Sequence, residues 1–156
     1  SKGKTEKSDF SAFVKLTHDP RGTFWIDAEI ERMDASRIAD RAVRICQGFL
    51  PHAIGFEANA FQELIGDSFL TKSRHSSVNV NYKAVHNTIN KLTRIRTLTP
   101  LLATGRIKVK NNRGGVALVD QLRQFPLPKT HDDGPDALEM AVRLCDATLS
   151  ELRMEV

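Results

Sequence analysis

The chain has 156 residues, of which 40% are hydrophobic and 27% charged, and its formal net charge is +4. These values are ordinary for one globular domain, and no apolar run approaches the roughly 20 residues that a transmembrane helix needs. No secretory signal is apparent, and two cysteines, Cys46 and Cys145, are too few for a disulfide framework. We therefore expect a cytoplasmic protein without membrane contact, with buried free thiols.

The first third of the chain predicts a hairpin followed by a helix. Residues 1–9 are polar and lysine-rich, which is typical of a loop. Residues 10–17 and 23–30 have strand character and flank a turn that contains Pro20 and Gly22, so they predict a β-hairpin. A helix capped by Asp34 or Ser36 is expected to run to Phe49, because its apolar residues recur at helical spacing.

The middle of the chain predicts one buried strand and two helices. Residues 53–57 form a short, mostly apolar strand that ends in Glu57, and residues 60–70 look helical. Residues 71–86 are polar, with an alternating stretch that fits a short strand or an extended loop. Residues 87–103 show a helical apolar face, and Gly105 is a plausible stop signal.

The last third predicts a strand over 106–110 and helices over 116–125 and 136–152, separated by Pro126 and Pro128. Strands thus alternate with helices after an initial hairpin. This order predicts one α/β domain, a mixed β-sheet flanked by helices.

Charge is distributed unevenly along the chain. Residues 72–113 contain ten Lys or Arg and no Asp or Glu, whereas residues 131–156 contain seven acidic residues and two basic ones. A solvated helix face beside an acidic loop is one explanation. A basic surface that contacts nucleic acid is favoured, because ten cations without an anion are unusual in 42 residues.

The most informative motif is HDDGPDAL, residues 131–138, which directly precedes an apolar helical pattern. Asp132 or Asp133 could cap that helix, with Pro135 in its first turn. Alternatively, clustered carboxylates bind a hard cation such as Mg²⁺ or Mn²⁺. The two explanations are compatible, and Asp133 and Asp136 share one helix face because they are three residues apart.

Glu57 is the natural partner of this motif, because ligands of open α/β sheets gather at the carboxyl ends of strands. An exposed glutamate that merely ends a strand is the alternative.

Four stretches of the sequence resemble, in order, the C-terminal nuclease domain of the large terminase subunit of tailed phages, which has a ribonuclease H-like fold of the integrase superfamily. They are KGKTEKSDFSAFV (2–14), IGFEANAFQ (54–62), KLTRIRTLTPLLATGRIK (91–108) and HDDGPDAL (131–138). The resemblance implies a ribonuclease H-like mixed sheet. It also implies that Glu57 is the second and Asp133 the third acidic ligand of a catalytic two-metal site. Asp136 is an additional ligand, as in Holliday-junction resolvases, and Asp132 is an adjacent one.

The sequence departs from the family pattern at the first acid. That Asp ends the first strand of the family fold, which would precede Ser1, so most of this strand is expected to be missing from the chain. Asp9 and Asp27 are the nearest substitutes, and neither fits well. The ATPase motor domain is expected to be absent too, because the chain has no phosphate-binding glycine loop.

The resemblance implies a metal-dependent endonuclease that cuts concatemeric double-stranded viral DNA during genome packaging, with two Mg²⁺ or Mn²⁺ ions flanking the scissile phosphate. We expect DNA contacts from the basic segment, with Lys91 and Arg94 preferred because they are three residues apart. The complete set of predicted DNA contacts is Lys83, Lys91, Arg94, Arg96 and His131; a surface turn is equally compatible with His131.

The resemblance also implies partners, namely the terminase ATPase domain, the small terminase subunit and the portal protein, in the host cell cytoplasm. Two other functions remain open at this point. One is a DNA-binding scaffold or prophage remnant that does not cut. The other is a Holliday-junction resolvase-like nuclease.

Overall fold

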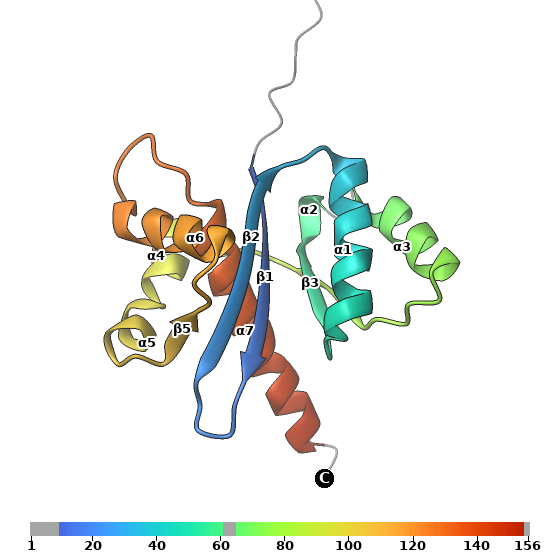
Figure 1. Cartoon of the computed structure of the whole chain (residues 1–156). Coiled ribbons are helices and arrows are strands. Elements are labelled where there is room, and N and C mark those ends of the chain that lie inside the picture. The colour runs from blue at the N-terminus through green and yellow to red at the C-terminus, as the bar shows by residue number, and fades with distance from the viewer. Residues whose placement is uncertain (1–9, 61–64, 155–156) are drawn as a thin grey trace, which may run out of the picture.

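The structure is a computed structural model that describes residues 10–60 and 65–154. Strands and helices alternate after an initial hairpin (Figure 1). The elements are β1 (Phe10–His18), β2 (Phe24–Arg32), α1 (Ala35–Phe49), β3 (Ile54–Glu57), α2 (Ala58–Ala60), α3 (Gly66–His75), β4 (Tyr82–Val85), α4 (Lys91–Arg96), α5 (Thr99–Ala103), β5 (Ile107–Val109), α6 (Arg113–Gln124) and α7 (Asp133–Met154).

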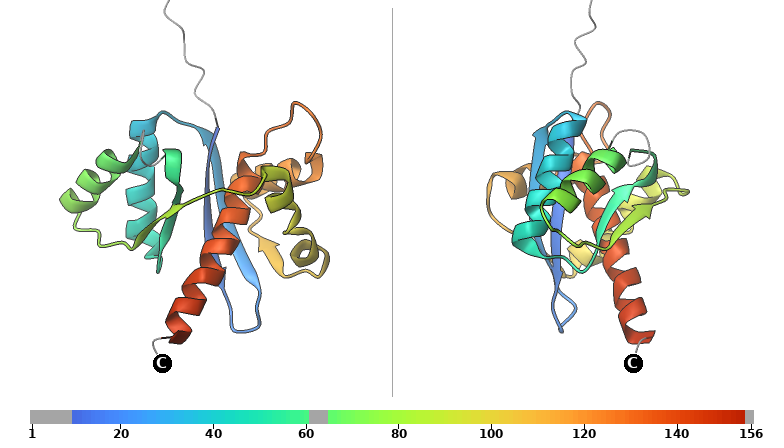
Figure 2. Two further views of the ribbon diagram at one scale, coloured as in Figure 1. Left: turned by 180° about the vertical axis from the view of Figure 1, so that it is seen from behind. Right: turned by 90° about the vertical axis from the view of Figure 1, so that its right-hand side faces the viewer.

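The strands form a mixed sheet in two pieces, which confirms the predicted α/β class. β1 and β2 pair antiparallel, with Phe10 opposite Arg32 and His18 opposite Phe24, and β5 adds to β2 in parallel. β3 and β4 form a separate parallel pair. In two opposite views, β3 runs beside β1 on the side away from β2 (Figures 1 and 2). No ladder of hydrogen bonds joins β1 and β3 among the described residues.

Two hydrophobic cores lie on either side of β1. In the first core, alternate residues of β2 such as Phe24 and Ile26 are buried against Leu118 of α6 and Leu138 of α7. In the second core, α1 packs against β3 and α3, with Phe56 and Phe69 in edge contact. β1 borders both cores, and each of its residues remains at least partly exposed.

Several predicted elements are confirmed with small shifts. The hairpin and α1 agree with the prediction, and the Asp34 side chain accepts a hydrogen bond from the Arg37 amide as a helix cap. α6 begins three residues earlier than predicted, because Asn112 caps it. α7 also begins three residues earlier, at Asp133, so both Asp133 and Asp136 belong to its first turn.

The predicted single helix over residues 87–103 is wrong. The segment forms two short helices, α4 and α5, and Pro100 lies in the first turn of α5. Proline lacks the amide hydrogen needed inside a continuous helix, so the chain restarts there. Ile89, expected on the buried face, precedes α4 and is 60% exposed. Residues 61–64 of the predicted helix over 60–70 lie outside the described residues.

Within the described ranges, the structure contains no helix that combines the length and apolarity needed to cross a membrane.

Candidate active site

The acidic motif is fixed by the packing of the first turn of α7 against α6. The Gln121 side chain of α6 accepts a hydrogen bond from the Gly134 amide at 2.8 Å, which satisfies a donor at the start of α7. A Cβ atom on Gly134 would lie 2.8 Å from Gln121 Oε1 and 2.9 Å from Leu118 Cδ1, so any larger residue would displace the ends of these two side chains. Gln121 therefore supplies a capping acceptor where the sequence pointed to Asp132 or Asp133.

A cavity of about 230 Å³ lies beside the acidic motif, between residues 130–133 and the paired ends of β1 and β2. His131 packs edge-on against the Phe10 ring at 4.6 Å, and the Arg32 guanidinium lies over the same ring at 4.4 Å. Asp132 and Asp133 complete the lining. The cavity thus combines oxygen ligands for a cation with donors for an anion.

Asp133 is the carboxylate of this cavity whose charge is disfavoured by its surroundings. Partial burial, followed by the neighbouring charge of Asp132, raises the pKa of Asp133 above its usual value. A raised pKa means that the folded chain disfavours the ionised form, which an added cation would favour.

Lys91 supplies a cation to the rest of the cluster. Its Nζ lies 3.2 Å from Asp132 Oδ1 and 3.4 Å from Asp136 Oδ2, so one ammonium bridges two carboxylates. The predicted partner of Lys91 was DNA, whereas here its charge is used within the acidic motif.

Arg94 occupies the protein interior. Its side chain is only 7% exposed, and Nη1 donates to Asp136 at 2.8 Å and to Glu139 at 2.7 Å. Glu139 is itself buried. This position disagrees with the predicted DNA contact of Arg94, because its guanidinium is enclosed between two carboxylates rather than presented on a surface.

A chain of hydrogen bonds continues from this pair to Glu57. Arg143 contacts both carboxylate oxygens of Glu139, at 2.9 and 3.0 Å. Arg143 also donates to Asn87 Oδ1 at 2.6 Å, and Asn87 Nδ2 donates to Glu57 Oε1 at 3.4 Å. The exposed carboxylate at the end of β3 is thus linked to the first turn of α7 through side chains rather than by direct contact.

The sequence reasoning missed Asn87, Glu139 and Arg143. The four-residue spacing of Glu139 and Arg143 on a helix was a visible signal of their ion pair. Nothing in the sequence pattern places Asn87 beside them, because that contact joins residues 56 positions apart.

The remaining predicted residues lie in different places. Lys83 pairs with Glu151 at 2.9 Å, far along α7 from the acidic motif. Arg96 is exposed and makes no ion pair with any residue in the described ranges. Asp27 pairs with Lys15 at 3.2 Å and lines a different cleft, which argues against it as a substitute for the first acid. Asp9 lies outside the described residues.

Within residues 10–60 and 65–154, no three His, Cys, Asp or Glu side chains gather closely enough to hold a metal ion. Asp132 and Asp133 share one cavity, whereas Glu57 is reached through Asn87. The described side chains alone therefore make a partial donor set, and the metal-ligand roles of Glu57, Asp132, Asp133 and Asp136 stay predictions.

Comparison with known proteins gives two matches. The model of the family described as terminase RNase H-like domain matches residues 2–144. Among solved structures, the human cytomegalovirus terminase nuclease domain, soaked with Mn, superposes with a TM-score of 0.60 at 15% sequence identity. The match covers 90% of this chain and 86% of that one, which confirms the ribonuclease H-like fold. A search of curated proteins gave no match.

Proposed function

Because the chain belongs to the family of terminase RNase H-like domains, we propose that it is a metal-dependent endonuclease domain that cuts double-stranded viral DNA during genome packaging. The observation that carries the proposal is the hydrogen-bonded chain between Glu57 and Asp136. It links the second and third acidic motifs, which lie far apart in the sequence.

The donor set suits Mg²⁺ or Mn²⁺, because carboxylate oxygens are the ligands that hard cations prefer. Glu57 and Asp133 would hold the metal, with Asp132 and Asp136 beside them. Bound metal would activate a water molecule and stabilise the leaving oxygen of the phosphodiester. The manganese soak of the cytomegalovirus domain supports this choice of cation.

We propose that a further strand, which carries the first acid, fits between β1 and β3. Among the described residues, β1 pairs only with β2 and β3 only with β4, so each has one edge without a ladder. Backbone N–H and C=O groups at such edges favour another strand. A strand there would join the two sheets and bring its own carboxylate toward the end of β3.

Residues of this chain would hold the DNA beside the acids. Arg32 and His131 line the same cavity as Asp132 and Asp133, where a phosphate group would meet side-chain hydrogen-bond donors. Lys91 lowers the repulsion between Asp132 and Asp136 by bridging both carboxylates. Arg96 and Lys83 would contribute long-range attraction to the phosphate backbone.

The proposed setting is the terminase complex in the host cell cytoplasm. An ATPase domain would drive the DNA, and the small terminase subunit and the portal protein would be neighbours. The family assignment supports this setting without identifying the individual partners.

The test is plasmid cleavage with Mn²⁺, comparing the chain with Glu57→Ala, Asp133→Ala and the control Asp120→Ala, an exposed acid on α6. Mn²⁺ binding is measured in parallel by calorimetry. We expect the first two variants to lose cleavage and to bind Mn²⁺ at least tenfold more weakly, while the control keeps both. Full cleavage by Glu57→Ala and Asp133→Ala would contradict the assignment. DNA binding without cleavage or Mn²⁺ binding by the unaltered chain would favour the non-cutting scaffold.

A resolvase-like function makes a separate prediction. It requires a stable dimer and preferential binding of four-way junctions over linear duplex. Sizing chromatography and a junction-binding assay therefore distinguish it from a terminase nuclease.

A further inference from the structure

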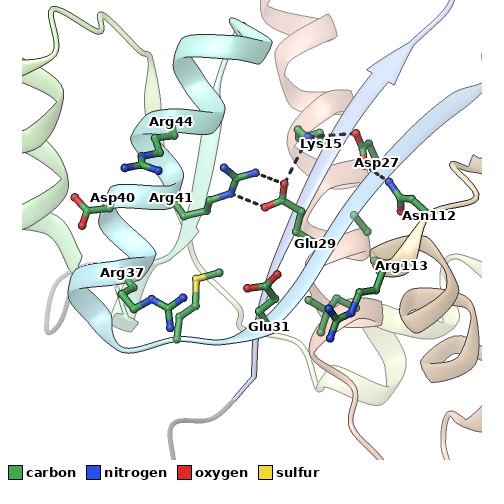
Figure 3. Close-up of a pocket in the computed structure, with 14 residues that line it drawn as sticks. Lys15, Asp27, Glu29, Glu31, Arg37, Asp40, Arg41, Arg44, Asn112 and Arg113 are labelled. Atoms are coloured by element: carbon green, nitrogen blue, oxygen red, sulfur yellow. Dashed lines mark hydrogen bonds and ion pairs between the residues drawn. The ribbon is translucent and has the colours of Figure 1, made fainter.

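A second cleft, of about 620 Å³, lies between the β1–β2 hairpin, α1 and the start of α6. Figure 3 shows Glu29 of β2 reaching toward Arg41 of α1 across this groove, while Asp27 lies beside Lys15 and Asn112, on the side of Arg113 of α6. The groove is distinct from the cavity that holds Asp132 and Asp133, since the two share no lining residue.

Most acids of the groove are neutralised within the protein. Arg41 holds Glu29 through two hydrogen bonds, one of them 2.7 Å from Nε to Oε2, and this contact is the main reason that the pKa of Glu29 is lowered. Lys15 pairs with Asp27 at 3.2 Å. Asp40, on α1, pairs with Lys72 of α3 at 2.8 Å.

Three arginines around the groove have no such partner. Among the described residues, Arg37, Arg44 and Arg113 form no ion pair or side-chain hydrogen bond, and all three are exposed. Arg37 and Arg44 are seven residues apart, so they lie along one face of α1, separated by about 10 Å along its axis. Glu31 is the acid of the lining that stays without an ion pair in the described part of the chain.

The first turn of α6, which carries Arg113, packs tightly against β2. A Cβ atom on Gly114 would lie 1.8 Å from the carbonyl oxygen of Ala28, so the first turn of α6 rests directly on β2. Asn112 fixes the same turn, because its side chain accepts from the Gly115 amide at 2.8 Å and donates to Asp27 at 3.0 Å. Arg113 is therefore presented from a fixed backbone position.

We propose that this groove binds the sugar–phosphate backbone of a nucleic-acid strand through Arg37, Arg44 and Arg113. Guanidinium groups match phosphate geometry with paired donors, and unpaired arginines lose no internal contact on binding. A cleft of this volume accommodates a short extended segment rather than a folded partner.

The position of the groove favours nucleic acid over an acidic polypeptide. Glu31 lines the groove and the next residue, Arg32, lines the cavity of Asp132 and Asp133. Successive side chains of a strand point to opposite faces, so the two clefts border the end of β2 from opposite faces of the sheet, and a bound strand would pass around that end. A strand held in the groove would lead to the candidate active site; this continuity rests on the proposed function, whereas binding itself does not.

The test measures binding of labelled single-stranded and duplex DNA by fluorescence anisotropy in EDTA, where cleavage is prevented. The triple variant Arg37→Ala, Arg44→Ala, Arg113→Ala is compared with a control of equal charge, Arg21→Ala, Arg123→Ala, Arg153→Ala. We expect the groove variant to bind single strands about tenfold more weakly or worse, with the salt dependence of log K reduced by about 2. Equal affinities and salt slopes in the two triple variants would overturn the proposal.

Glu31→Gln provides a test of opposite sign, and it is expected to tighten binding because it removes the unpaired acid. Unchanged or weaker binding by this variant would count against the groove. Poly-L-glutamate is the competing probe. If the groove variant loses binding of poly-L-glutamate but keeps that of DNA, the groove is a site for acidic polypeptide and the proposal is wrong.

Failure of the cutting function would look different. A chain that binds DNA through these arginines in EDTA but does not cleave with Mn²⁺ contradicts the proposed function and supports the groove. A chain that cleaves normally, with DNA affinity insensitive to all three arginines, contradicts the groove alone. Circular dichroism melting of each variant confirms that it is folded.

Discussion

The side chains of Asn87 and Arg143 meet at 2.6 Å, between Asn87 Oδ1 and Arg143 Nη2. This contact fixes the orientation of the Asn87 amide, because the oxygen faces the guanidinium and the nitrogen is then directed to Glu57. Arg143 is in turn held by the buried Glu139. The direction of an exposed carboxylate on β3 is therefore set by a residue of α7.

Replacing Asn87 with alanine tests this arrangement. The variant removes the donor to Glu57, so we expect Mn²⁺ affinity to fall by about 10- to 100-fold, as when a ligand loses its supporting hydrogen bond. Calorimetry with Mn²⁺ measures the effect, and the exposed Asn111→Ala is the matched control. Equal Mn²⁺ affinities in these two variants would show that Asn87 does not position Glu57.

Arg94 offers a test of stability rather than function. Arg94→Met removes the closest cation of the buried Glu139, which keeps its two contacts with Arg143, so we expect a loss of about 1.5–3 kcal/mol, as for a hydrogen bond to a charged group. Urea denaturation should show this loss in the free energy of unfolding. Arg96→Met, an exposed arginine two residues away, is expected to stay within about 0.5 kcal/mol of the unaltered chain. A similarly small change in Arg94→Met would mean that Arg143 alone compensates the charge of Glu139.

Local sequence patterns were sufficient for the elements that depend on near neighbours. The hairpin follows from two alternating stretches around Pro20 and Gly22, and α1 from helical periodicity after Asp34. The acidic motif at the start of α7 was also visible, because Asp is a preferred helix cap and Pro fits the first turn of a helix. These features need no information on tertiary contacts.

Contacts between distant residues were not predictable in the same way. The sequence predicts both Arg94 and Arg96 as DNA contacts on one helix, with Arg94 preferred, yet Arg94 is buried and Arg96 is exposed. Only the docking of α4 on α7 distinguishes them, by bringing Asp136 and Glu139 to Arg94. The groove arginines were missed for a related reason: α1 and the start of α6 are brought together only by folding over β2.

Glu29 should make stability depend on pH. The hydrogen bonds from Arg41 are the main cause of its lowered pKa in the folded chain, so the ionised form is favoured on folding. This contribution is fully present above the ordinary glutamate pKa and is lost as the pH falls through the lower folded value. Glu29→Gln should therefore reduce the free energy of unfolding by about 1 kcal/mol at pH 7. The difference from the unaltered chain should shrink as the pH falls below the ordinary glutamate pKa. A pH-independent difference would exclude this explanation.

Asp133→Asn separates stability from metal binding at the candidate active site. Partial burial and the charge of Asp132 raise the pKa of Asp133, so its ionised form opposes folding at pH 7. The amide removes that charge, and we expect a melting temperature higher by about 1–3 °C in EDTA. The same variant should lose the rise in melting temperature that Mn²⁺ gives the unaltered chain, because a bound cation stabilises the folded state only where its ligands are present. Asp120→Asn, on the exposed face of α6, should change neither value. A variant at Asp133 that melts lower in EDTA and still responds to Mn²⁺ would show that this carboxylate is structural.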